Sequence, residues 1–85
     1  MRIDPAYTLH DVAGEHIVLI QDMEENKVLS LNPTAVYLWK ELYGREFTLE
    51  EAASLLTSAY EVEAEQATTD AGNWIQELHA LGIIR

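Results

Sequence analysis

The chain has no cysteine, and this absence excludes three kinds of chemistry. Without thiols there is no disulfide framework, no thiolate metal site and no thiol nucleophile. Long hydrophobic runs are also missing: no segment approaches the length of a membrane span, and residues 1–11 lack the apolar core of a signal peptide. These absences predict a cytoplasmic protein that is not associated with a membrane.

Clusters of catalytic side chains are lacking as well. The three histidines lie in separate predicted elements, without the spacing of a zinc site or a catalytic triad. Asp22, Glu24 and Asn26 begin like a calcium-binding loop, but Lys27 stands at its glycine position and Pro33 at its final glutamate position. The sequence therefore predicts a protein that is not an enzyme and that holds neither a metal ion nor a cofactor.

Basic residues are scarce. Five Lys and Arg stand against 15 Asp and Glu, which gives a formal net charge of −10 at pH 7. Such a charge repels nucleic acid and favours a neutral or basic partner. The alternative is that the charge contributes only to solubility. What the chain does have is an ordinary globular composition, with 48% hydrophobic residues over a length of 85. This predicts a single folded domain over residues 1–85.

The most informative stretch is residues 27–43, where a short extended run turns directly into a helix. Asn32 is placed to cap the first free helical amides, and Pro33 supplies the φ angle of the first helical position. Apolar residues then recur at helical spacing and predict a face that packs on a core. They are Ala35, Leu38, Trp39 and Leu42.

Three strands precede that helix. Residues 7–11 alternate like a short strand that Gly14 ends in a turn. Residues 17–20 are four apolar residues in a row, too apolar for a strand with one wet face, and predict the central strand. The polar residues 22–26 then predict a hairpin connection into a third strand over residues 27–31.

Two further helices follow. Thr48 and Glu51 form the pattern of a capping box, with Gly44 ending the previous helix and Phe47 available as a hydrophobic staple. The predicted inner face of this second helix comprises Leu49, Ala52, Ala53, Leu56 and Ala59. Residues 63–81 predict a third helix, with Gly82 as its C-cap. Its apolar stripe comprises Ala64, Ala67, Ala71, Trp74, Ile75, Leu78 and Leu81.

The order of three strands and then three helices predicts an α+β domain of winged helix-turn-helix type. DNA binding, the commonest use of that fold, is the alternative function. It requires a basic surface, but residues 46–81 carry eight acidic residues and no Lys or Arg. Both helices that would approach DNA would therefore repel it.

With these elements in place, the chain resembles the PqqD family. The matching segments are Gly14-Glu15 before the apolar strand 17–20, Leu31-Asn32-x-Thr34-Ala35 with Trp39, Thr48-x-Glu50-Glu51, and Leu78-x-x-x-Gly82-Ile83. The resemblance implies a non-catalytic adaptor, a RiPP recognition element, that binds the leader segment of a ribosomally made precursor peptide. It also implies a partner enzyme, either a modifying enzyme such as a radical SAM protein or a leader peptidase, in the biosynthesis of pyrroloquinoline quinone, a lasso peptide or another peptide modified by a radical SAM enzyme.

An edge strand at residues 27–31 would leave backbone groups free for an added peptide strand, and the third helix beside it would complete a groove. The residues predicted to bind peptide are Lys27, Val28, Leu29, Ser30, Leu31, Ala71, Trp74, Ile75 and Leu78. The alternative for each of them is core packing. The same free edge predicts a monomer or a weak homodimer.

The third helix departs from the family pattern. Ala71 and Gly72 stand where bulkier apolar residues are usual. The predicted second helix departs as well, with alanines at positions 52 and 53. A glycine inside a helix costs about 1 kcal/mol relative to alanine. Gly72 therefore requires either tight packing, which is the interpretation we prefer, or room for a ligand backbone.

Overall fold

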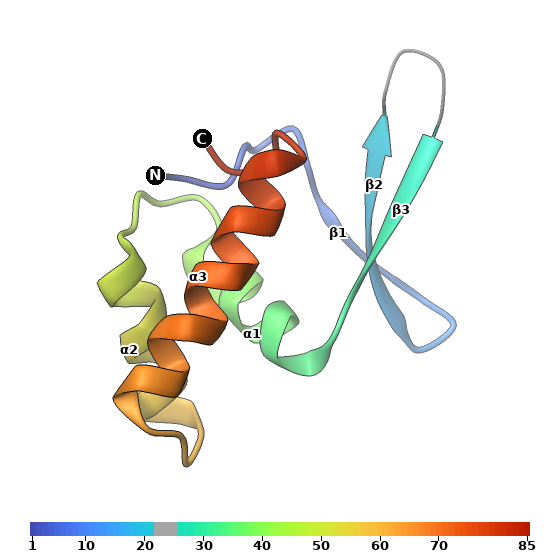
Figure 1. Ribbon diagram of the computed structural model, residues 1–85. Coiled ribbons are helices and arrows are strands. Elements are labelled where there is room, and N and C mark those ends of the chain that lie inside the picture. Colours follow the sequence, from blue (N-terminus) through green and yellow to red (C-terminus); the bar gives the residue numbers. More distant parts are fainter. Residues whose placement is uncertain (22–25) are drawn as a thin grey trace.

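The computed structural model describes residues 1–21 and 26–85 (Figure 1). The elements are β1 (Leu9–Val12), β2 (Glu15–Gln21), β3 (Asn26–Leu31), α1 (Pro33–Leu42), α2 (Leu49–Ala59) and α3 (Ala64–Ala80). This order confirms the predicted α+β arrangement of three strands followed by three helices. Residues 22–25 of the predicted hairpin connection, which also begin the calcium-like loop, lie outside the described residues, and Asn26 is the first residue of β3.

The sheet is antiparallel with the order β1-β2-β3, so β2 is central as predicted and β3 forms one edge. Only one of its faces is covered. Val18 and Ile20 are buried, whereas Leu19 between them is 45% exposed. The prediction that this strand is too apolar to have a solvent-exposed face is therefore wrong. The helices lie on one side of the sheet, and β2 and β3 extend beyond them (Figure 1).

The helix starts predicted from the sequence are confirmed. The Asn32 side chain accepts a hydrogen bond from the backbone N–H of Ala35 over 2.8 Å, and Pro33 is the first residue of α1. At α2, the Thr48 side chain accepts from the Glu51 N–H, while the Glu51 carboxylate accepts from the Thr48 N–H. These caps satisfy backbone donors that have no partner within the helix.

The core lies between the three helices and the covered face of the sheet. All four predicted inner residues of α1 are buried, and so are Leu56 of α2 and Leu78 of α3. Two predicted inner residues, Ala59 and Ala64, are exposed instead. They are the last residue of α2 and the first of α3, so they lie at the connection between the helices and not against the core.

The two ends of the chain lie together and complete the core (Figure 1). Ile3 forms an isolated antiparallel bridge with Ile84, and both side chains are buried. The backbone of Phe47 is tied to Met1, since the Phe47 N–H donates to the Met1 carbonyl over 2.8 Å. The last residues of the chain, 83–85, therefore cover the core by pairing with the N-terminal segment.

Gly72 is not explained by tight packing. A Cβ atom added at this position would meet only the Leu49 Cδ1 atom, at 3.8 Å, which is an ordinary van der Waals distance. We therefore expect Gly72→Ala to stabilise the protein by about 0.5–1 kcal/mol through the higher helix propensity of alanine. Urea unfolding would measure this gain, and a loss of stability would show that the site needs glycine after all.

No helix within residues 1–21 and 26–85 combines the length and the apolar character needed to cross a bilayer.

Candidate functional site

The turn between β1 and β2 establishes which backbone groups of the sheet are free. Ala13 and Gly14 both have positive φ, 54° and 83°, as in the two-residue turn that suits a hairpin. The residues that flank such a turn, Val12 and Glu15, exchange both of their backbone hydrogen bonds. Glu15 therefore directs its backbone N–H and C=O toward β1. Successive residues of a strand direct these groups to opposite sides, so Val18, three residues later, directs its N–H and C=O toward β3.

The register then shows the direction of the groups on β3. Val18 pairs with Leu29, so Leu29 directs its backbone groups inward, to β2. Its neighbours Val28 and Ser30 direct theirs outward, because the directions alternate. β3 is at the edge of the sheet, so these outward groups have no partner strand among the described residues. An extended chain could pair there through backbone hydrogen bonds.

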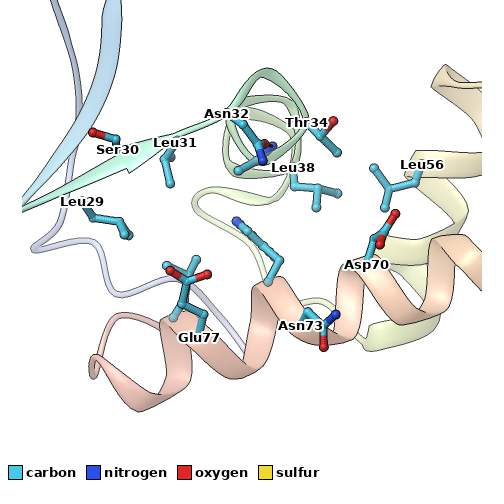
Figure 2. A pocket seen from close by; sticks show the side chains of 13 residues that line it. Leu29, Ser30, Leu31, Asn32, Thr34, Leu38, Leu56, Asp70, Asn73 and Glu77 are labelled. Carbon is cyan, nitrogen blue, oxygen red and sulfur yellow. Dashed lines mark hydrogen bonds between the residues drawn. The ribbon is translucent and has the colours of Figure 1, made fainter.

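A pocket of about 360 Å³ separates this edge strand from α3 (Figure 2). β3 contributes Leu29, Ser30 and Leu31 to its lining. The other lining residues are Asn32, Thr34, Ala35 and Leu38 from the start of α1, Leu56 from α2, and Asp70, Asn73, Trp74, Glu77 and Leu78 from α3. Leu31 points toward α3, whereas Ser30 points away from it (Figure 2).

The nine predicted peptide-binding residues divide into two groups. Five of them line the pocket: Leu29, Ser30, Leu31, Trp74 and Leu78. The other four do not. Lys27 and Val28 are exposed on β3 beyond the pocket, Ala71 is completely buried in the core, and Ile75 is half-buried against it.

Sequence reasoning missed the polar wall of the pocket. Asp70, Asn73 and Glu77 lie on α3 at spacings of three and four residues, so they share one helical stripe. That stripe adjoins the one that contains Trp74 and Leu78. The spacing is visible in the sequence, but polar residues at helical spacing are equally typical of a face that only meets solvent.

The indole of Trp74 carries an unsatisfied donor. Trp74 is 7% exposed and lines the pocket, and its Nε1 atom is buried without an acceptor in residues 1–21 and 26–85. A buried N–H without a partner costs about 1–3 kcal/mol. An oxygen acceptor bound in the pocket would recover that cost.

The charge of the pocket is entirely negative. Its ionisable lining residues are Asp70 and Glu77, and no Lys or Arg occurs from residue 46 to residue 84. This is unfavourable for a phosphate backbone, which a DNA-binding surface neutralises with basic side chains. The arrangement suits a neutral or basic ligand.

These features define a small domain of three strands and three helices in which the open edge of β3 lies beside a groove. The chain belongs to the PqqD family: the family model described as "Coenzyme PQQ synthesis protein D (PqqD)" matches residues 15–84. The match covers all three helices and the two strands next to them, and it leaves out β1. It confirms the resemblance found in the sequence.

A solved structure shares the fold. It is described as "TbiB1 in Complex with the TbiA(beta) Leader Peptide" and superposes with a TM-score of 0.78 at 16% sequence identity. The alignment covers 100% of this chain and 95% of the other. No curated protein matches the sequence significantly.

Proposed function

We propose that this domain binds the leader segment of a ribosomally made precursor peptide by adding it as a strand to β3. The observation that carries the proposal is the open edge at Val28 and Ser30 beside the pocket. Membership of the PqqD family supports it, and so does the shared fold with a domain whose structure holds a leader peptide.

The geometry explains how such a segment would be held. Backbone hydrogen bonds to Val28 and Ser30 would supply affinity without reading the sequence of the peptide. Alternate side chains of an added strand point to one face of the sheet. On the covered face they would enter the pocket, where Leu31, Leu38 and Trp74 offer apolar contacts. The predicted ligand is therefore extended, with apolar residues at every second position.

A selection experiment tests this proposal. Twelve-residue peptides would be selected from a random display library, and leader segments encoded beside the gene would be synthesised. Amide NMR of the ¹⁵N-labelled protein would locate them. We expect shifts at residues 27–31 and 71–78. Shifts confined to β1 and α2, or the selection of no peptide, would contradict strand addition at β3.

The domain would act as an adaptor that presents the bound leader to a modifying enzyme or a leader peptidase. In this role it contributes no catalytic group, and the purified domain should leave a bound peptide chemically unchanged. Mass spectrometry of peptide incubated with the domain alone checks this. A covalent change or cleavage that depends on the domain would overturn the adaptor role.

The same free edge allows weak self-association, because a second copy can pair with β3 in place of a peptide. We expect a monomer, or a weak dimer that dissociates when a groove-binding peptide is added. Light scattering with and without peptide distinguishes these states. A tight oligomer that persists with peptide would show that the edge is not shared between the two.

A further inference from the structure

Glu77 brings an unpaired negative charge to the β3 end of the pocket. Its side chain extends from α3 toward β3, on the side where Leu29 lies (Figure 2). Two ion pairs occur in the described part of the chain, and neither involves Glu77. Lys27, which lies on the same strand as Leu29, is not within ion-pair distance of the Glu77 carboxylate. The Glu77 carboxylate is therefore available to a ligand.

The other carboxylate of the pocket is already engaged. Asp70 accepts a hydrogen bond from the Gln66 Nε2 atom, one helical turn earlier, over 2.8 Å. Figure 2 shows it at the opposite end of the pocket, near Leu56. The two acidic side chains are therefore not equivalent, and a basic group of a ligand should pair preferentially with Glu77.

A second, independent feature adjoins Glu77. Trp74 precedes it by three residues, so the two side chains are neighbours on the surface of α3. The buried indole N–H of Trp74 has no acceptor within the described residues. The residue that carries this donor and the residue that carries the anion therefore lie one helical turn apart, and both line the same pocket.

We propose that the bound segment carries a Lys or Arg residue whose side chain pairs with Glu77, and that it supplies an oxygen acceptor to the Trp74 N–H. This inference rests on the proposed function. The hydrocarbon stem of a basic side chain can lie along the apolar wall while its charged head reaches the carboxylate at the rim. The net charge of −10 would also attract a basic segment to the groove.

The probes are the twelve-residue peptides from the library selection, labelled with fluorescein. We expect Lys or Arg at a fixed position relative to the apolar residues. For each peptide, a partner with Gln in place of that residue would be synthesised. Both would be titrated against the wild type and Glu77→Gln by fluorescence polarisation. A partly exposed ion pair is worth about 1 kcal/mol at most, so the expected preference for the basic peptide is about three- to five-fold.

Glu77→Gln should abolish this preference, and Glu77→Lys should reverse it in favour of a peptide with Glu at the same position. The matched control is Glu65→Gln, which removes one charge from the same helix outside the pocket. General attraction by the net charge would weaken equally in both variants. The specific ion pair would be lost in Glu77→Gln alone, so Glu65→Gln should retain the preference. Equal losses in the two variants would overturn the assignment to Glu77.

The Trp74 contact has a separate readout. The chain has two tryptophans, so its labelled form gives two indole N–H signals in NMR. Trp39 is in the core, outside the pocket, and serves as the internal reference. Binding should shift the Trp74 indole signal and slow its exchange with solvent, while the Trp39 signal stays. Movement of both signals, or of neither, would contradict a hydrogen bond to Trp74.

The outcomes separate the two proposals. Peptides that bind at residues 27–31 and 71–78 without a preference for a basic residue would overturn this inference and leave the proposed function intact. Peptides that bind elsewhere, or a selection that yields none, would overturn both.

Discussion

Proline at position 30 should weaken peptide binding by about tenfold or more while the fold survives. Because backbone directions alternate along β3, the Ser30 amide points to the open edge, so proline removes a donor that the sheet itself does not use. A peptide carbonyl that docks there would lose its hydrogen bond, which costs about 1–3 kcal/mol when the group is desolvated. Fluorescence polarisation with a selected peptide would measure the loss.

The matched control is proline at the neighbouring position. The Leu29 amide donates inward to β2, so Leu29→Pro should break the ladder and destabilise the sheet by about 1–3 kcal/mol. Ser30→Ala keeps the amide and should bind peptide like the wild type. Circular dichroism and urea unfolding separate the effects. If Ser30→Pro unfolds the domain while Leu29→Pro does not, the Ser30 amide points inward and the Leu29 amide points to the edge, and the assignment of free groups on β3 is wrong.

The parts of the fold that the sequence predicts well are those fixed by neighbours in the chain. Asn32 and Pro33 act on the first turn of α1, and Thr48 acts on the amide of Glu51 three residues later. Such caps involve interactions over three or four residues, and the relevant residue types are few. The order of elements follows from them, and the structure confirms it.

Contacts between distant segments have no comparable signal. Ile3 pairs with Ile84, and Phe47 anchors the N-terminal segment by its backbone. Nothing in the residues around either position specifies a partner some 80 or 46 positions away. An apolar residue near an end of a chain is equally compatible with exposure and burial.

The groove could be predicted from the sequence only in part. The strand and the helix that form its sides were predictable, and five of the nine predicted residues line the pocket. The rotation of α3 about its axis was not, because the apolar stripe is wide enough for several orientations. That rotation buries Ala71 completely and brings Asp70, Asn73 and Glu77 to the pocket. The polar half of the candidate site therefore became visible only in the structure.

Truncation of Phe47 should have the largest effect on stability. Its side chain is 2% exposed, and its ring centroid lies 6.3 Å from that of Trp74, the residue that lines the pocket from α3. Phe→Ala in a core costs about 3–5 kcal/mol, against a total of roughly 4–13 kcal/mol for a domain of 85 residues. A large share of the free energy of unfolding would therefore be lost.

The position of Phe47 also links that loss to the groove. Phe47→Leu keeps most of the buried volume, so it should cost much less than Phe47→Ala, yet it removes the aromatic neighbour of Trp74. We therefore expect a folded Phe47→Leu domain whose Trp74 indole signal is shifted and whose peptide affinity is reduced. Urea unfolding followed by tryptophan fluorescence, with NMR of the folded variant, measures both effects. A cost below about 1 kcal/mol for Phe47→Ala, against the 3–5 kcal/mol of a core phenylalanine, would mean that neither the packing of α3 nor the wall of the groove depends on the Phe47 side chain.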